Sequence, residues 1–189
     1  KREAALAAKQ NLGYDRTCRH LTAEQMAGKM AAGLPSVVRF KVPDRQGMLG
    51  YDDKVLGRIE CDYREVDDFV ILRSNGKPLY LLCNVVDDIR DRITHIIRGQ
   101  DHMTNTTRQV LLYEALLAPL PVFAHIPLTL DTKKSKISKR SHGEIVAVHF
   151  YRDHGFIPWA FNNFLVLLGW SPGNDQEIFS KEELIEAFT

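Results

Sequence analysis

The sequence has 189 residues, of which 44% are hydrophobic and 26% are charged, as is usual for a globular protein with a sizeable core. It contains no apolar run of roughly 18 residues and no secretory signal at its start, so we expect a cytoplasmic protein without a membrane span. Three scattered cysteines exclude a disulfide framework, and a net charge of +1 excludes a protein held to nucleic acid by charge alone.

Two helices are predicted in the first part of the chain. Residues 1–10 are strong helix formers with no capping residue before them, which suggests a chain that begins inside an element. A second helix is expected near Thr22 to Ala32, with Thr22 and Gln25 forming a capping box and Gly33 ending it.

Residues 37–73 have the pattern of β-strands. Four segments, VVRFKV, MLGY, KVLGRIE and DFVILR, are separated by turn-forming residues, and the first of them alternates apolar with polar side chains. Asn75-Gly76 then predicts a tight turn.

Strands and helices alternate after Pro78. LYLLCNVVDDI predicts a helix, THIIRG a short buried strand, NTTRQVLLYEALL a helix, and VFAHIP a second strand. This alternation is typical of a parallel, doubly wound α/β sheet, of which this stretch covers half.

A basic loop at residues 133–140 is followed by a helical region. EIVAVHFYRDHG is expected to end at Gly155, the next helix to begin at Pro158, and a last helix to start with a capping box of Ser180 and Glu183. The apolar positions of FNNFLVLLGW are expected to lie in a core.

Two lysines three residues apart, Lys136 and Lys139, lie in the basic loop. In that arrangement they can surround a polyphosphate and offset the charge that develops as a phosphate bond breaks. A solvated loop or a general RNA contact would have the same composition. The loop follows a predicted strand, however, and ligands bind at the carboxyl ends of such strands, which favours phosphate binding.

Arg98 ends the first strand of the α/β segment, just before Gly99. Its planar fork could project into the crevice and bind a carboxylate through two parallel hydrogen bonds. The alternative is a structural ion pair with Asp87, Asp88 or Asp101 at the sheet edge.

Cys18 and His20 could supply two ligands of a tetrahedral zinc ion. No second pair of ligands is visible, so a free thiol beside a surface histidine is the favoured interpretation. Other histidines have no partner at catalytic or metal spacing, and no role is predicted for four of them: His125, His142, His149 and His154.

Several motifs together resemble the bacterial-type glutamyl-tRNA synthetases of class I. KISKR is similar to their KMSKS signature, and CRHLTAEQ, VVRFKVP, NVVDD, HIIRG, FAHIPL, HGFIPWAFNNFLVLLGWSPG and EIFSKEELIEAF occur in the family's order. The family's other ATP signature, the HIGH-like motif, is not in this sequence, nor are the first strand and helix of its nucleotide fold.

The resemblance implies three segments. Residues 78–141 would be the second half of a Rossmann-type α/β catalytic domain. Residues 1–77 would be part of an α+β insertion that binds the tRNA acceptor end, and residues 142–189 the start of a helical region that contacts the tRNA stem. The resemblance also implies an anticodon-binding domain outside this sequence.

The resemblance further implies a reaction and its residues. ATP with Mg²⁺ would activate L-glutamate to glutamyl-adenylate, and the 3′ end of tRNA(Glu) would accept the glutamyl group. Lys136 and Lys139 would bind ATP and stabilise its phosphates, and Asp101 is a further candidate for the nucleotide pocket. Tyr80 and Arg98 would hold glutamate, with Arg98 favouring it over glutamine. We expect a monomer.

Two alternatives stay open. A glutamyl-queuosine tRNA(Asp) synthetase shares the nucleotide fold but ends soon after it. An RNA-binding fragment without catalysis is the other, because half of the ATP site would be missing. We therefore expect this chain to be inactive by itself.

Overall fold

The computed structural model describes residues 14–188, which divide into two units. The first takes in the described residues up to Arg98 together with His102–His125. The second consists of Gly99–Asp101 and the described residues from Ile126 onward. The helix predicted for residues 1–10 lies outside the described part of the chain.

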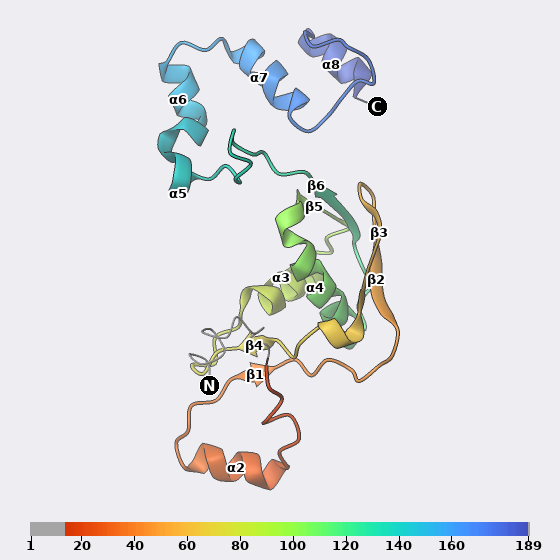
Figure 1. Ribbon diagram of the computed structural model, residues 1–189, viewed down its shortest axis with the longest axis vertical. Helices are drawn as coiled ribbons and strands as arrows, with labels where there is room; N and C mark the ends of the chain where they lie inside the picture. Colours follow the sequence, from red (N-terminus) through yellow and green to blue (C-terminus); the bar gives the residue numbers. More distant parts are fainter. Residues whose placement is uncertain (1–13, 189) are drawn as a thin grey trace. The chain divides into compact units, whose positions relative to one another are not determined.

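Helix α2, Ala23–Ala31, confirms the predicted capping box (Figure 1). The Thr22 hydroxyl accepts a hydrogen bond from the Gln25 backbone N–H at 3.2 Å, and the Gln25 side chain accepts one from the Thr22 N–H at 3.0 Å. These bonds satisfy two N–H groups that would otherwise have no partner at the start of the helix. Gly33 follows the helix with a φ of +70°, a conformation that favours glycine.

Four strands and a 3₁₀ turn occupy the predicted β-rich segment: β1 Val38–Arg39, β2 Met48–Asp53, β3 Gly57–Asp62, η1 Tyr63–Glu65 and β4 Val70–Leu72. Strands β1 and β4 form an antiparallel two-stranded sheet, and β2 pairs antiparallel with β3 along its full length. The β-strand prediction is therefore confirmed for this segment, although VVRFKV contributes only the two-residue strand β1.

The turn between β2 and β3 corrects one strand boundary. The sequence predicts a strand beginning at Lys54, but residues 54–56 form a turn and the strand begins at Gly57. The reason is the Asp53 carboxylate, which accepts hydrogen bonds at 3.0 Å from the backbone N–H groups of both Val55 and Leu56. Aspartate commonly stabilises turns in this way.

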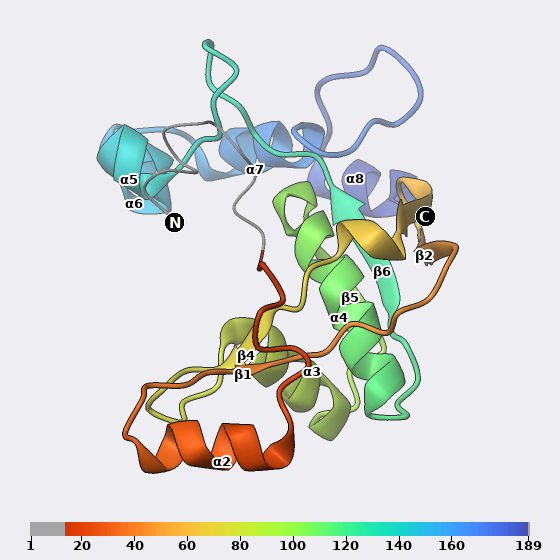
Figure 2. The same cartoon turned by 60° about the horizontal axis from the view of Figure 1, so that its bottom comes forward.

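The predicted α/β segment contains five elements: α3 Tyr80–Arg90, β5 His95–Gly99, η2 Gln100–His102, α4 Met103–Ala115 and β6 Val122–Ile126. Its strands join the β2–β3 hairpin in a four-stranded sheet with the order β3-β2-β6-β5, in which β2 and β6 are parallel (Figure 1). Figure 2 shows β2 and β6 from a second direction. Helix α4 connects the neighbouring strands β5 and β6. The sheet thus combines strands from both sides of residue 77, and the predicted domain boundaries at 77 and 141 stay a prediction.

Strand β5 is less buried than the sequence suggests. His95 is exposed, and Ile97 keeps 69% of its surface accessible. The physical reason is its position, because β5 is an edge strand of the described sheet. The prediction of a buried strand is therefore wrong for this chain as described.

The core of the first unit lies between the sheet and helices α3 and α4. Val85 on α3, Leu111 on α4 and Phe123 on β6 are each at most 1% exposed. The ring of Tyr51 on β2 meets Phe123 edge-on, with 5.3 Å between the ring centroids. Burying a side chain of this size contributes roughly 1.5–3 kcal/mol, so these contacts fix α4 against the strands.

A buried ion pair anchors the segment that precedes α2. The side chains of Arg19 and Asp68 are 2% and 3% exposed and are in contact. Arg19 also donates to the Val42 carbonyl oxygen at 2.7 Å and contacts Asp44 at 2.9 Å, while Asp68 accepts the Val42 N–H at 2.9 Å. The hydrogen bond to Asp68 raises the pKa of Arg19 above its ordinary value.

From Ile126 onward, the described residues of the second unit form five helical elements: α5 Lys139–His142, η3 Gly143–Val146, α6 Val148–Asp153, α7 Pro158–Leu167 and α8 Lys181–Ala187. Pro158 begins α7 and the Ser180–Glu183 capping box begins α8, as predicted. The helix predicted before Gly155 is shorter than expected, because its first part is the 3₁₀ turn η3. That part contains the β-branched pair Ile145 and Val146, which have low helix propensity.

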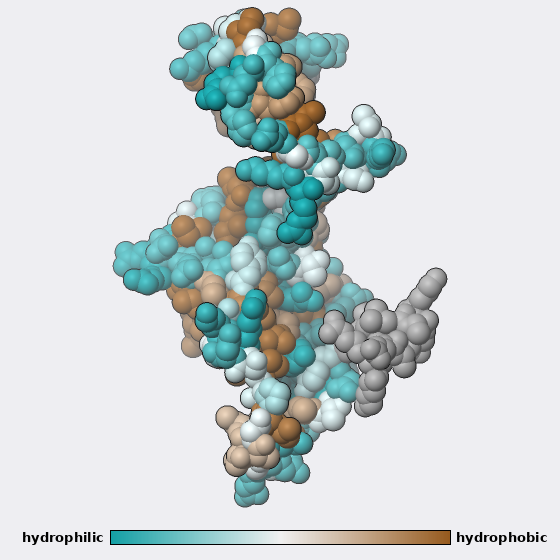
Figure 3. Space-filling model, turned by 90° about the vertical axis from the view of Figure 1, so that its left-hand side faces the viewer, coloured by the Kyte–Doolittle hydropathy of each residue, from teal (hydrophilic) through white to brown (hydrophobic). Residues whose placement is uncertain are grey.

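The apolar residues of α7 are not the core that the sequence predicts. Phe164 is 55% exposed and Leu165 is 44% exposed, and apolar residues reach the surface among polar ones on the face shown in Figure 3. The buried residue of α7 is Asn163, whose side chain donates to the Glu177 carbonyl at 2.7 Å and accepts the Phe179 N–H at 2.9 Å. None of the described helices is both long enough and apolar enough to cross a membrane.

Candidate active site

Arg98 is the centre of a polar cluster at the end of β5. Its Nη2 donates hydrogen bonds to Thr106 Oγ1 at 2.6 Å and Gln109 Oε1 at 2.5 Å, and its Nε donates to His125 Nε2 at 3.4 Å. Thr106 and Gln109 lie on α4 and His125 on β6, and all three are at most 1% exposed. Side chains from two elements therefore hold the guanidinium from behind.

Both hydrogens of Nη2 are used, whereas no hydrogen bond among the described residues uses Nη1. The predicted two-nitrogen grip on a carboxylate would have to displace Thr106 or Gln109, so Nη1 is the nitrogen that can meet a ligand. In the described chain, no ion pair joins Arg98 to Asp87 or Asp88, and Asp101 contacts Lys136. Arg98 is thus held by hydrogen bonds to side chains on α4 and β6, and its ligand-binding role stays a prediction.

A fully buried pair, Asp53 and His125, lies behind Arg98. His125 Nδ1 is 2.6 Å from Asp53 Oδ2, and neither side chain has exposed surface. Burial raises the pKa of Asp53, but hydrogen bonds from Leu56 and His125 outweigh this effect and lower the pKa to about 2. Asp53 is therefore a carboxylate at neutral pH and accepts the proton carried by Nδ1. His125 Nε2 remains the acceptor for Arg98.

Tyr80 and Asn84 are four residues apart on α3 and share one face of the helix. The Asn84 side-chain oxygen accepts a hydrogen bond from Gln109, which links α3 to the Arg98 cluster. The Tyr80 ring is half exposed and lies 6.1 Å from the ring of His102. The structure thus connects the helix face that carries Tyr80 with the cluster around Arg98, and the glutamate-binding role of both residues stays a prediction.

The basic loop belongs to the second unit, where Asp131 organises it. The Asp131 carboxylate accepts the backbone N–H groups of Lys133 at 2.9 Å and Ser135 at 2.7 Å, and it lies 3.2 Å from His142 Nε2. The hydrogen bond from Ser135 lowers the pKa of Asp131. One carboxylate therefore holds both the start of the loop and the helix that follows it.

The two predicted phosphate-binding lysines have different settings. Lys136 is exposed and contacts the carboxylate of Asp101, so the structure brings together two of the residues predicted for the nucleotide pocket. Lys139 is the first residue of α5 rather than a loop residue, which corrects the predicted extent of the loop. The reason is Ser138, whose hydroxyl caps the helix by accepting the Ser141 N–H at 3.3 Å.

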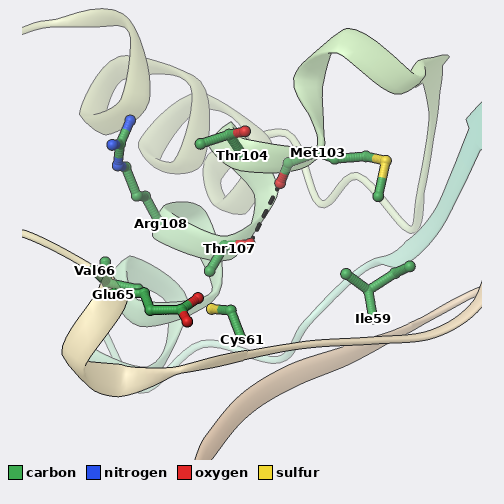
Figure 4. Close-up of a pocket in the computed structure, with 8 residues that line it drawn as sticks. All are labelled: Ile59, Cys61, Glu65, Val66, Met103, Thr104, Thr107 and Arg108. Atoms are coloured by element: carbon green, nitrogen blue, oxygen red, sulfur yellow. Dashed lines mark hydrogen bonds between the residues drawn. The ribbon is translucent and has the colours of Figure 1, made fainter. Parts of the chain in front are cut away.

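A pocket of about 280 Å³ lies between β3 and the first half of α4 (Figure 4). Its lining combines apolar side chains with Glu65 and Arg108, and the Thr107 hydroxyl donates to the Met103 carbonyl oxygen at 3.4 Å beside it. Burial raises the pKa of the Cys61 thiol at its edge, which keeps that sulfur in its less reactive form. None of the predicted site residues lines this pocket, so we place the candidate site elsewhere.

Cys18 and His20 are both exposed and flank the buried Arg19. Within residues 14–188, no group of three or more His, Cys, Asp or Glu side chains is placed to hold a metal ion. The described chain thus brings no further ligand to Cys18 and His20, and zinc binding there stays a prediction.

The sequence interpretation missed the two histidines that matter for this geometry. Neither His125 nor His142 has a sequence partner at catalytic or metal spacing, but in the structure they contact Asp53 and Asp131 respectively. Asp53 is 72 residues away from His125 in the sequence, so no local spacing reveals the pair. The parallel register of β2 and β6, which aligns Asp53 with Phe123, brings the two side chains together.

The fold and the site define a class of protein. Strands β2 and β6 are parallel, polar residues gather where β5 and β6 end, and a basic loop follows β6, as in α/β domains that bind their ligands at the carboxyl ends of strands. The model of the family "tRNA synthetases class I (E and Q), catalytic domain" matches residues 1–189. The chain belongs to this family.

Curated relatives agree with this assignment. The chain is 71% identical over 189 residues to the glutamate–tRNA ligase of Desulfotalea psychrophila, and 48% identical over 176 residues to that of Aquifex aeolicus. These matches cover 100% and 93% of the chain but 38% and 37% of the relatives. The chain therefore spans well under half the length of these relatives.

Solved structures have the same fold. The glutamate–tRNA synthetase of Elizabethkingia anophelis superimposes with a TM-score of 0.80 at 31% identity, over 98% of this chain and 42% of that one. A glutamate–tRNA ligase from Elizabethkingia meningosepticum, in complex with its amino acid, gives the same TM-score and identity over 98% of this chain and 41% of that one.

Proposed function

We propose that this chain is the part of a cytoplasmic glutamate–tRNA ligase that binds the glutamate side chain and the phosphates of ATP. The observation that carries the proposal is Arg98, a half-buried guanidinium held from behind by Thr106, Gln109 and His125 with Nη1 left for a ligand in the described structure. The names of the curated relatives support the same reaction.

In this reaction the α-carboxylate of glutamate attacks the α-phosphate of ATP, pyrophosphate leaves, and glutamyl-adenylate forms. The terminal ribose hydroxyl of tRNA(Glu) then attacks the activated carbonyl, and AMP leaves. Arg98 Nη1 pairs with the side-chain carboxylate of glutamate, while Tyr80 helps to hold the amino acid. Glutamine would present a neutral amide to the charged guanidinium, and losing a charged partner in a buried site is costly.

Lys136 and Lys139 serve the phosphates. Both are exposed cations, three residues apart along the chain, and positively charged groups of this kind stabilise the charge that develops on a leaving pyrophosphate. Asp101 holds Lys136 until a phosphate competes for it. Mg²⁺ bound with ATP offsets further phosphate charge.

The test uses the Desulfotalea psychrophila ligase with its matching segment replaced by this chain, since the chain covers 38% of that protein. Glutamate-dependent ATP–pyrophosphate exchange is measured with tRNA(Glu) present and with glutamine as the control substrate. Arg98→Ala should abolish exchange with glutamate, and Lys139→Ala should slow exchange with little effect on the KM for glutamate. Arg90→Ala and Lys181→Ala, which change cations elsewhere in the same two units, are the matched controls.

Normal glutamate use by a folded Arg98→Ala chimera would exclude the proposed role of this residue. A chimera that binds tRNA(Glu) but shows no exchange, although it is folded, would favour the RNA-binding alternative. Exchange with glutamine at the rate seen with glutamate would contradict the proposed specificity.

A further inference from the structure

We infer that Asp53 and His125 are positioning residues that fix the Arg98 guanidinium and thereby set the preference for glutamate over glutamine. The inference rests on the proposed glutamate-binding role of Arg98. It assigns a function to two fully buried side chains that act through Arg98. They lie on β2 and β6, which are paired as parallel strands.

The hydrogen bonds of His125 determine which of its ring nitrogens carries the proton. Asp53 is held as a carboxylate, so the 2.6 Å contact with His125 Nδ1 requires the imidazole proton to be on Nδ1. His125 Nε2 then has a lone pair, which faces Arg98 Nε at 3.4 Å and Thr106 Oγ1 at 2.9 Å. Arg98 Nε can only donate, whereas the Thr106 hydroxyl, which also donates to the His102 carbonyl oxygen at 3.2 Å, can donate or accept. It is therefore Arg98 that requires Nε2 to stay an acceptor.

The position of Asp53 is fixed independently of Arg98. Its carboxylate accepts the backbone N–H groups of Val55 and Leu56 in the turn after β2, and that of His125 on β6. The strand register thus fixes the carboxylate, the carboxylate fixes the imidazole tautomer, and the imidazole fixes one edge of the guanidinium. With Thr106 and Gln109 holding Nη2, Nη1 is aimed in one direction.

A purely structural role is the competing explanation, since the same carboxylate closes the β2–β3 turn. Asp53→Asn separates the two roles. Its amide keeps an oxygen for the turn but presents an NH₂ group to His125 Nδ1, which moves the ring proton to Nε2. Nε2–H and Arg98 Nε–H then face each other as two donors, and Arg98 must move.

A pair of variants at His125 changes the other end of the contact. His125→Gln retains an oxygen that can reach the place of Nε2 and accept from Arg98, whereas His125→Leu fills similar space without an acceptor. Both remove the side-chain hydrogen bond to Asp53 and keep the backbone one, so a structural role predicts similar behaviour for the two. The positioning role predicts that His125→Gln retains much more glutamate affinity than His125→Leu.

The experiment measures kcat and KM for glutamate, and use of glutamine, in the same chimera. Asp53→Asn and His125→Leu should raise the KM for glutamate by about 10- to 100-fold, the usual effect of losing a hydrogen bond to a charged group, with a smaller change in kcat. The discrimination against glutamine should fall by a similar factor. His125→Gln should stay within roughly threefold of the parent, and Asp52→Asn, at the exposed neighbouring aspartate of β2, should match the parent.

Thermal melting establishes which variants are folded, and if Asp53→Asn does not fold, the His125 pair decides. An unchanged KM and unchanged discrimination in folded His125→Leu would overturn the inference, as would equal KM values for His125→Gln and His125→Leu. Failure of the proposed function is recognised separately, because Arg98→Ala would then use glutamate normally. Loss of activity in Arg98→Ala together with a normal His125→Leu refutes the positioning role alone.

Discussion

Replacing Arg19 with methionine should destabilise the first unit by about 3–5 kcal/mol, the cost of leaving one member of a buried ion pair without its partner. The side chains of Arg19 and Asp68 are 2% and 3% exposed, so water cannot take the place of the lost guanidinium. Asp68 would keep the Val42 N–H as a hydrogen-bond donor, and the Val42 carbonyl would lose its donor from Arg19.

Arg16 provides the matched control, because it lies three residues earlier in the same segment. Its contact with Asp44 is 3.8 Å long, and the two side chains are 41% and 66% exposed. Exposed pairs of this kind contribute about 0–1 kcal/mol, so Arg16→Met should leave stability nearly unchanged.

Urea denaturation of the chain provides the assay, with far-UV circular dichroism reporting on both units. Both tryptophans, Trp159 and Trp170, lie in the second unit, so their fluorescence is an internal reference that Arg19→Met should leave nearly unchanged. The double variant Arg19→Met/Asp68→Leu removes both charges and should be more stable than Arg19→Met. Equal unfolding midpoints for Arg19→Met and Arg16→Met, or a double variant less stable than Arg19→Met, would refute the reasoning.

Three other changes have definite expected results. Gly50→Ala would place a Cβ 2.9 Å from the Ile59 carbonyl oxygen across the β2–β3 hairpin, so it should cost about 1–3 kcal/mol, and an unchanged melting temperature would contradict this. Ser180→Ala removes the α8 capping box and should cost about 1 kcal/mol of local stability, visible as faster amide exchange in the first turn of α8. The pKa of Asp53 falls from 3.8 to about 2 on folding, so its ionised form stabilises the fold above pH 3.8, and this contribution is lost as pH falls through about 2. In acid titrations, the stability difference between the parent and Asp53→Asn should therefore shrink over that interval, and a constant difference would argue against it.

The elements predicted from local signals are largely confirmed. Thr22 with Gln25 and Ser180 with Glu183 are capping boxes three residues apart, so sequence spacing alone determines their geometry. Helix α3 also begins and ends close to its predicted limits. Its start is predictable because Pro78 cannot lie in the interior of a helix.

Contacts that depend on the sheet could not be predicted in this way. The position of Arg98 at a strand end makes it a candidate from sequence alone, but its partners on α4 and β6 depend on how those elements pack. The exposure of Ile97 has the same origin, since its composition fits a buried strand and only the strand order puts β5 at an edge. For α7, the apolar sequence predicts burial, but no element of the described second unit covers Phe164 and Leu165.

The carboxylate at position 53 satisfies four donors at once: the backbone N–H groups of Val55, Leu56 and His125, and the imidazole of His125. An asparagine has one acceptor oxygen where aspartate has two, and a glutamate would move both oxygens by the length of a methylene group. Neighbouring side chains of a strand point to opposite faces, so the exposed Asp52 does not meet these four donors and instead lies 3.2 Å from the exposed Arg58. Two adjacent, chemically identical residues therefore have very different mutational tolerance: one admits almost any polar replacement, and the other admits none without loss.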